Sequence, residues 1–456
     1  MYLAGQIHKF RVFDKNLVLD VNSGSIFEVD NIMYDVLDYY RVLSDNDIIA
    51  KLKTKYSKLD IEEALKEIKA METEGYLFSN LDTNAILDKL DTRQYVKALC
   101  LNVAHDCNLR CKYCFASKGD YHGKREIMSS EVGKKALEFL AENSGDMEDV
   151  EVDFFGGEPL LAMDTVREVI SYARILEKTW GKRFHFTITT NAVLLDDETI
   201  EYLHENMDNI VLSLDGRKEV NDFIRVRADG SGSYDKIVPN IKRVVELREK
   251  DNKEYYVRGT FTKHNLDFAK DVFHIANLGI REISLEPVVG KEGDYLLEDK
   301  DLDTLWKQYD EIAKEYMNRK KTGKLPFKFY HFNIDIYNGP CVYKRVWACG
   351  AGRDYLAVTP SGDIYPCHQF IGQDEFLMGN VADGKLDQKI VDILKDTHVF
   401  EKEECSQCWA RYFCSGGCNA NNLLICGDMK KPYHITCELQ KKRIEYAIYL
   451  NLFSSE

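Results

Sequence analysis

Apolar and polar positions repeat with two different periods along the chain, and the order of these periods divides it into three parts. In residues 1–90, three short β-rich runs at 5–14, 16–21 and 24–30 come first, and three helical patterns follow. Strands followed by helices at this size predict a small winged-helix-like module.

From about residue 95 to 310, runs typical of strands alternate with amphipathic helical stretches. The runs lie at residues 97–104, 150–155, 184–190, 209–214, 254–262 and 282–289. Repeated βα units predict an α/β fold with a parallel sheet, whose active residues follow the carboxyl ends of the strands. Because there are six repeats rather than eight, we expect a partial (β/α)6 TIM-like barrel that is partly open.

Composition changes in the last part of the chain. Nine of the thirteen cysteines lie between residues 341 and 437, in a region poor in long periodic segments. A chain of 456 residues with 45% hydrophobic residues is long enough for two or three globular domains. We therefore predict domains at 1–90, 95–310 and 325–456, and we expect the last to be held together by something other than hydrophobic burial.

Charge and hydropathy narrow the range of partners. The net charge of -15 is spread along the chain without a basic block, so nucleic acid is not expected as a partner. No run of eighteen apolar residues and no signal-peptide pattern occurs, so we expect no membrane contact and a cytoplasmic location. Cytosolic thiols stay reduced, which favours metal or redox chemistry over disulfides.

The first cysteine motif follows the strand at 97–104. Cys107, Cys111 and Cys114 have the spacing C-x3-C-x2-C, and polar residues between them disfavour a buried helical cysteine stripe. A tetrahedral metal site needs four ligands, so His105 is one candidate for a fourth zinc ligand. An unfilled fourth position is the other interpretation.

The segment CNLRCKYC resembles the C-x3-C-x-aromatic-C signature of radical S-adenosylmethionine (SAM) enzymes. The resemblance implies that the three thiolates bind a [4Fe-4S] cluster whose fourth iron is chelated by SAM. It also implies reductive cleavage of SAM to a 5'-deoxyadenosyl radical that abstracts a substrate hydrogen. Tyr113 and Phe115 are then expected to border the cluster and the adenine.

A second motif follows the next strand and strengthens this resemblance. Gly156, Gly157 and Glu158 are followed by a proline and resemble the GGEP loop of the family; the glycines allow close backbone approach and the carboxylate can accept hydrogen bonds from the SAM ammonium. Further candidate SAM contacts at strand ends, which are also ordinary turn residues, are Thr189, Asn191, Ser213, Asp215 and Arg225.

The C-terminal cysteines form a third pattern, for which two structural zinc sites are the alternative. Its order and gaps resemble the SPASM domain, which holds two auxiliary Fe-S clusters in radical SAM enzymes that modify peptides and proteins. The resemblance implies cluster I on Cys349, Cys367 and Cys418, and cluster II on Cys405, Cys408, Cys414 and Cys437.

Three cysteines remain outside these sets. Cys341 is a possible fourth ligand of cluster I; otherwise an iron stays open to a substrate thiolate. Cys100 and Cys426 fit no motif, and Cys100 is expected in the core. In total, the resemblance implies SAM and three [4Fe-4S] clusters as cofactors.

Residues 1–90 resemble the element that binds the leader of a ribosomally made peptide as an added strand. Together these features resemble thioether-forming sactisynthases that act on six-cysteine precursor peptides. The implied partners are a Cys-rich precursor peptide and an electron donor such as flavodoxin or ferredoxin. Alternatives are a C-C crosslinking peptide maturase, a zinc-stabilised peptide-binding adaptor, or a sulfatase-type maturase that makes formylglycine. The last of these needs a base, for which His368 is a candidate. An exposed loop histidine is the simpler interpretation of His368.

Overall fold

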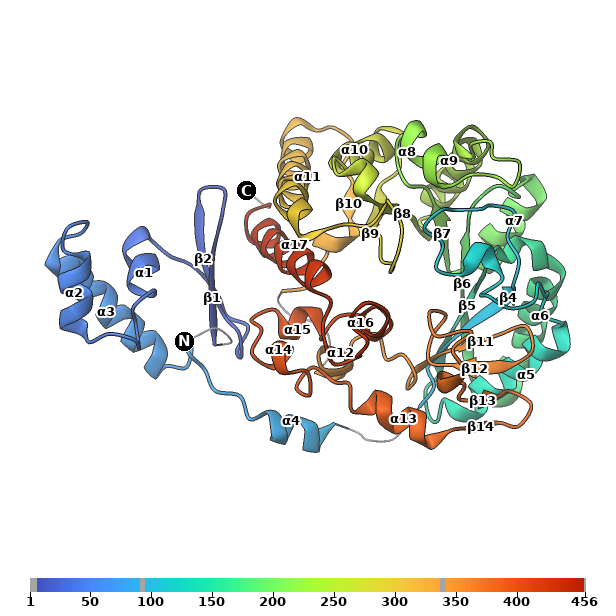
Figure 1. The fold of residues 1–456 in the computed structure, drawn as a ribbon, viewed down its shortest axis with the longest axis horizontal. Helices are drawn as coiled ribbons and strands as arrows, with labels where there is room; N and C mark the ends of the chain where they lie inside the picture. The colour runs from blue at the N-terminus through green and yellow to red at the C-terminus, as the bar shows by residue number, and fades with distance from the viewer. Residues whose placement is uncertain (1–5, 91–94, 337–341, 455–456) are drawn as a thin grey trace.

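The structure is a computed structural model and describes residues 6–90, 95–336 and 342–454. An N-terminal unit lies at one end of the molecule, a large sheet covered by helices lies at the other, and the C-terminal segment lies between them (Figure 1). Within the described residues, no helix has the length and apolar character needed to cross a membrane.

The N-terminal unit is a three-stranded antiparallel sheet followed by helices, in the order predicted from the sequence. Its elements are β1 (Ile7–Val12), β2 (Lys15–Asp20), β3 (Ile26–Glu28), α1 (Asn31–Val36), α2 (Asp45–Leu52), α3 (Lys58–Thr73) and α4 (Thr83–Lys89). The strand order is β1-β2-β3, so β1 and β3 are the edges. The side chains of Ser44 and Ser57 accept hydrogen bonds from backbone N–H groups in the first turns of α2 and α3, which fixes where these helices begin.

The β1–β2 hairpin has two apolar faces because its side chains alternate. Leu17 and Leu19 belong to the core of the rest of the molecule, whereas Val18, between them, packs with the helices of the N-terminal unit. On β1, the ring of His8 stacks on Trp409 with centroids 3.7 Å apart. The hairpin is therefore packed between its own helices and the C-terminal segment.

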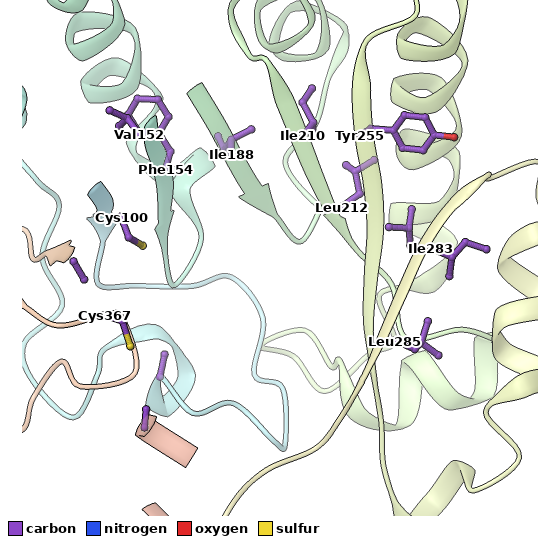
Figure 2. Packing of buried hydrophobic residues seen from close by; sticks show 14 of the residues in the cluster. Cys100, Val152, Phe154, Ile188, Ile210, Leu212, Tyr255, Ile283, Leu285 and Cys367 are labelled. Atoms are coloured by element: carbon purple, nitrogen blue, oxygen red, sulfur yellow. The ribbon is translucent and has the colours of Figure 1, made fainter. Parts of the chain in front are cut away.

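The central sheet contains the six predicted parallel strands, which confirms the partial (β/α)6 barrel. These strands are β4 (Ala98–Ala104), β5 (Asp149–Gly156), β6 (Arg183–Thr190), β7 (Asn209–Ser213), β8 (Glu254–Phe261) and β9 (Glu282–Pro287). Each is parallel to the next along the chain. Buried side chains from successive strands form one continuous core (Figure 2). Cys100 lies in this core, as expected, with 1% of its surface exposed.

Helices between the strands cover the outer face of the sheet (Figure 1). They are α5 (Ser130–Asn143), α6 (Met163–Trp180), α7 (Asp197–Asn206), α8 (Lys218–Ile224), α9 (Tyr234–Lys250), α10 (Ala269–Asn277) and α11 (Leu302–Thr322). α5 to α10 occupy the stretches between the strand runs, where amphipathic helices were expected. The outer layer leaves the carboxyl ends of the strands free to carry a site.

Two short strands extend the sheet beyond the six predicted from the hydrophobic runs. β10 (Lys328–Phe329) pairs parallel with β9, and β11 (Tyr355–Val358) pairs parallel with β4 at the other edge. β11 lies in the cysteine-rich part and continues into the antiparallel strands β12 (Asp363–Tyr365), β13 (Gly379–Asn380) and β14 (Lys385–Leu386). The C-terminal part therefore pairs with the β4 edge of the barrel sheet and extends the sheet beyond it.

The remaining helices of the C-terminal part are short, except for the last. They are α12 (Val342–Trp347), α13 (Gln388–Lys395), α14 (Glu403–Ser406), α15 (Arg411–Cys414), α16 (Asn419–Cys426) and α17 (His434–Phe453). α17 packs on α11 and β1. Its buried Arg443 donates hydrogen bonds to the Tyr309 hydroxyl at 2.8 Å and to Glu286 at 3.1 Å, which fixes α17 against the barrel.

Candidate active site

A cavity of about 140 Å³ lies at the carboxyl ends of β4 to β7. The residues proposed from the sequence that line it are Cys107, Cys111, Cys114, Tyr113, Phe115, Gly156, Gly157, Glu158, Thr189, Asn191, Ser213 and Arg225. Asp215 is the one residue of the proposed SAM contacts that does not line it. Lys118, Gly119 and Thr190 also line the cavity, although no sequence motif pointed to them.

The cysteine loop is irregular, so the three thiols do not form a helical stripe. The backbone N–H of Leu109 points at the Cys107 sulfur at 3.4 Å, and the N–H of Arg110 bonds to the Val226 carbonyl at 2.8 Å. Burial raises the pKa of Cys107 to about 12 and that of Cys111 to about 11. Metal binding at these thiols would therefore displace protons at neutral pH.

The paired glycines are explained by the cysteine loop itself. A Cβ on Gly156 would lie 2.3 Å from the carbonyl oxygen of Ala104, and a Cβ on Gly157 would lie 2.2 Å from that of Asp106. The backbone N–H groups of Gly157 and Glu158 bond to those two carbonyls at 2.8 and 2.9 Å. The glycines thus permit close contact between the two loops, in addition to leaving space in the cavity.

The Glu158 carboxylate is buried, with 1% of the residue exposed. It accepts hydrogen bonds from the Thr190 hydroxyl at 2.7 Å and from the backbone N–H groups of Asn191 at 2.8 Å and Leu160 at 3.1 Å. Burial raises its pKa, and these hydrogen bonds oppose the rise. A carboxylate has about four acceptor positions, so roughly one remains for a donor in the cavity.

Asp215 does not line the cavity but contacts Tyr113, which does. The Tyr113 hydroxyl lies 2.9 and 3.0 Å from its two oxygens, and the backbone N–H of Thr260 donates at 3.1 Å. Arg225 donates to the same Tyr113 hydroxyl at 2.9 Å. Burial raises the pKa of Asp215, whereas Arg225 lowers it. This network fixes the ring of Tyr113, and Arg225 reaches the cavity wall.

Asn191 joins the end of β6 to the cysteine loop. Its side-chain amide donates to the Asn108 side-chain oxygen at 2.7 Å and approaches the Cys107 sulfur at 3.6 Å. Its side-chain oxygen accepts from the backbone N–H of Val193 at 3.0 Å. Asn191 therefore has a role in positioning Cys107, which the sequence analysis did not anticipate.

The two candidate histidines each pack against aromatic rings. His105 is buried and stacks on Tyr121 with centroids 4.7 Å apart, and its ring does not line the cavity. His368 is half-buried rather than exposed, because its ring packs 5.4 Å from Phe115 and 4.8 Å from Phe155. Burial lowers the pKa of His368 to about 4.

The C-terminal cysteines lie in two groups. Cys367, Cys418 and Cys349 lie within electrostatic range of one another, as do Cys405, Cys408, Cys414 and Cys437. Burial and neighbouring thiols raise the pKa of Cys405 to about 11 and that of Cys437 to about 12. Cys341 lies outside the described residues. Within 6–90, 95–336 and 342–454, no three His, Cys, Asp or Glu side chains are arranged to hold a single metal ion.

The first group adjoins the barrel core and the cavity. Cys367 lies close to Cys100 of β4 (Figure 2). The next residue, His368, contacts Phe115 and Phe155, which both line the cavity. The cavity and the first C-terminal cysteine group are therefore separated by one layer of aromatic and imidazole rings.

Comparison with known protein families agrees with this arrangement. The family described as the radical SAM superfamily matches residues 101–258, and the family described as SPASM, an iron-sulfur cluster-binding domain, matches residues 349–409. The first match contains the cysteine loop and the GGEP loop. The second begins at Cys349 and ends at Trp409.

Individual relatives cover most of the chain at low identity. The radical SAM cyclopropyl synthase TigE of Paramaledivibacter caminithermalis is 24% identical over 426 residues, which cover 87% of this chain and 84% of TigE. A cysteine-type anaerobic sulfatase-maturating enzyme of Clostridium novyi is 25% identical over 331 residues, which cover 69% of this chain and 86% of that enzyme.

Solved structures with the same fold include two with bound molecules. Native anSMEcpe with bound AdoMet aligns with a TM-score of 0.64 at 22% identity, covering 79% of this chain and 99% of anSMEcpe. Streptococcus suis SuiB bound to precursor peptide SuiA aligns with a TM-score of 0.53 at 18% identity, covering 92% of this chain and 95% of SuiB. At these identities the likeness establishes the fold.

Proposed function

This chain is a radical SAM protein with a SPASM iron-sulfur cluster-binding domain, and from that premise we propose that it forms sulfur-to-carbon thioether crosslinks in a Cys-rich, ribosomally synthesised precursor peptide. We assign the cavity at the cysteine loop to SAM and its [4Fe-4S] cluster, and the two C-terminal cysteine groups to two auxiliary clusters. Thiolates are the ligands that such clusters use.

When bound, SAM and the three clusters would supply hydrogen-atom abstraction from a substrate carbon and an acceptor for a second electron. The chain itself shapes the site. Glu158 offers its remaining acceptor position to a cationic group, the Asp215 network fixes Tyr113, and Arg225 provides a positive charge at the wall. Phe115 and Phe155 form the side that faces the C-terminal domain.

The observation that carries the proposal is that the residue next to Cys367 packs against the lining of the cavity. His368 contacts Phe115 and Phe155, and we propose that a peptide bound at the cavity also lies near the first C-terminal cysteine group. Three described thiols belong to that group. We propose that a peptide thiolate occupies the fourth position of this cluster, which would hold the sulfur next to the carbon that is activated in the cavity.

The assignment of the open position can be tested without substrate. If a peptide thiolate fills it, Cys341→Ala should retain the iron content of the wild type, whereas Cys367→Ala should lose about four irons per chain. Iron and sulfide analysis of anaerobically purified protein measures both. A comparable iron loss in Cys341→Ala would assign Cys341 as the fourth ligand.

The N-terminal unit supports a peptide substrate. β3 is an edge strand that pairs only with β2 among the described residues, so its outer edge is available for an added strand. Strand addition at a sheet edge is a common way to bind an extended peptide. We propose that the leader binds β3, as part of a winged-helix-like recognition unit.

Co-expression with a Cys-rich precursor, followed by mass spectrometry and thiol alkylation, tests the reaction. Thioether formation removes two hydrogen atoms and one alkylatable thiol per crosslink. Conversion of cysteine to formylglycine would instead remove the sulfur atom. Consumption of SAM with an unchanged peptide would contradict the proposal.

Carbon-carbon bond formation is a second candidate, because the relative TigE is a cyclopropyl synthase and aligns over 87% of this chain. That reaction would also remove two hydrogen atoms from a peptide, but every thiol would remain open to alkylation. The alkylation count therefore separates the two candidates in one experiment.

A further inference from the structure

A lysine is buried between the two C-terminal cysteine groups. Lys402 has 1% of its surface exposed and is among the largest fully buried side chains of the described residues. It lies within electrostatic range of Cys418 and Cys349 from the first group and of Cys405, Cys414 and Cys437 from the second. It is therefore placed to act on both groups.

The loop between the two groups is built around this side chain. The Lys402 ammonium donates to the Gly416 carbonyl at 2.8 Å and to the Asn419 side-chain oxygen at 2.6 Å. Gly416 lies between Cys414 of the second group and Cys418 of the first. A Cβ on Gly416 would lie 3.1 Å from the Lys402 Cδ and 3.2 Å from its Nζ, so the glycine leaves room for the lysine.

The charge of Lys402 is not balanced by an acidic side chain. No Asp or Glu within the described residues forms a salt bridge with it, and its two hydrogen-bond acceptors are neutral. Burial lowers the pKa of Lys402, whereas the four nearby thiols, when ionised, raise it. An isolated buried ammonium is strongly unfavourable unless an anion compensates it.

We propose that Lys402 is a shared positive counter-charge for the two auxiliary clusters and raises the reduction potentials of both. A cluster ligated by thiolates is an anion, and nearby charge and hydrogen bonding are among the factors that set its potential. The inference rests on the proposed assignment of the two cysteine groups to clusters. It makes Lys402 a positioning residue that acts through the clusters and does not touch the substrate.

The functional consequence concerns electron flow during crosslinking. The proposed reaction leaves one electron that an auxiliary cluster must accept. A fixed positive charge between the clusters favours the reduced state of each, because reduction adds a negative charge beside the ammonium. A single side chain would thereby adjust both acceptors together.

Substitution of Lys402 by residues that separate charge from hydrogen bonding tests the proposal. Lys402→Arg retains the positive charge, and Lys402→Gln retains a hydrogen-bond donor without the charge. Lys402→Met retains most of the side-chain length but has neither the charge nor the donor. The matched control is Lys182→Met, because Lys182 is also buried and its ammonium also donates to two carbonyls, those of Gly145 at 2.5 Å and Met147 at 2.6 Å. Those two carbonyls are far from the C-terminal cysteines in the sequence, in the loop before β5.

The readout is a potentiometric titration followed by electron paramagnetic resonance, together with the iron content. Cys107, Cys111 and Cys114 are replaced by alanine in every variant, so that only the auxiliary clusters contribute. We expect Lys402→Gln and Lys402→Met to lower both midpoint potentials, with about tenfold less reduced cluster at a fixed potential, or ~59 mV for a one-electron couple. Lys402→Arg and Lys182→Met should have midpoint potentials close to those of the parent.

Two outcomes would overturn the inference, and a third would overturn its premise. Potentials in Lys402→Gln equal to those of the parent would assign Lys402 a purely structural role in the loop. The same structural role would follow if none of Lys402→Met, Lys402→Gln and Lys402→Arg bound iron. Loss of iron in the two neutral variants alone would support a requirement for the charge. A parent protein without about eight auxiliary irons would refute the cluster assignment itself.

Discussion

The loop with Cys107, Cys111 and Cys114 and the C-terminal cysteine array differ in what holds their thiols in place. The loop follows β4, which is buried along its whole length, and the backbone of the GGEP loop bonds directly to it. Most of the array lies on helices of four to eight residues and on loops between them, whereas Cys437 lies near the start of the 20-residue α17. Short helices of this kind are marginal without further contacts.

The difference indicates which region depends on its metal. The barrel has a continuous apolar core and a complete ladder of parallel strands, so its cysteine loop is positioned before a cluster binds. The array has a buried lysine that pairs with no Asp or Glu among the described residues, and a buried ammonium is unfavourable unless an anion compensates it. We infer that the proposed clusters would order the array, whereas the loop would keep its position without a cluster.

Removal of iron should produce the largest difference in amide protection between the two regions. We expect anaerobic chelation to abolish amide protection across residues 403–432, because the metal-ligand bonds proposed there would hold its short helices and loops in place. Strands β4 to β6 should keep their protection. Hydrogen exchange with mass spectrometry measures both segments in one sample, and equal loss in both would show that the barrel also depends on its cluster.

Gly157→Ala should disrupt the loop in the presence of metal. A Cβ at this position would meet the Asp106 carbonyl oxygen at 2.2 Å, and neither backbone can move without breaking the contact between the loops. We expect a loss of about 3 kcal/mol in unfolding free energy and of about a third of the iron. Urea unfolding and iron analysis test this.

Gly123→Ala is the matched control for that substitution. A Cβ on Gly123 would lie 3.4 Å from the Asp120 carbonyl oxygen, an ordinary contact. Its iron content should equal that of the wild type. If Gly157→Ala also retained all its iron, close contact between the loops would not be needed to hold the first cluster.

Substitution of Asp153 on β5 tests the sheet that the two regions share, in which β5 pairs with β4 and β4 pairs with β11. Burial raises its pKa to about 6, whereas an unfolded Asp ionises near 3.8. A raised pKa means that the folded protein holds the proton more tightly, so its contribution to stability is present below about pH 4 and is lost as the pH rises to about 6.

Asp153→Asn should therefore increase the unfolding free energy above pH 6, by at most about 3 kcal/mol, and should have little effect near pH 4. Urea unfolding of both proteins at several pH values gives the difference directly. A difference that does not change between pH 4 and 6 would show that the Asp153 carboxyl is not perturbed in the folded chain.

Trp409→Ala should have the smallest effect, at the contact between the array and the N-terminal unit. The Trp409 ring stacks on His8, and such a pair contributes about 0.5–1.5 kcal/mol. We expect faster release of the N-terminal unit by limited proteolysis and an unchanged iron content. Trp180→Ala, at a position with 41% of the residue exposed, is the control and should show no change.

The repeating features of the fold could be predicted from the sequence. The six βα units and the position of Cys100 in the core follow from local periodicity, and the structure confirms them. The grouping of the C-terminal cysteines was instead implied by the resemblance to the SPASM domain. Each of the periodic signals is contained in a short stretch of chain.

Features that depend on contacts between distant segments could not be predicted. The pairing of β11 with β4 joins residues 355–358 to 98–101, and no local pattern encodes such a pairing. The contact of Gly156 with Ala104 and the position of Asp215 behind Tyr113 also depend on how loops meet. Lys402 resembles a surface lysine in sequence, and only its burial shows that it is not one.

The pairing of β11 with β4 has a consequence for folding during synthesis. Until residue 358 leaves the ribosome, the first strand of the barrel has an unpaired edge, which is a site for incorrect pairing with other chains. At 5–20 residues per second this interval lasts roughly ten seconds to a minute. We expect the cell to protect this edge with a chaperone during that interval, or to accept a lower yield when the chain is truncated before β11.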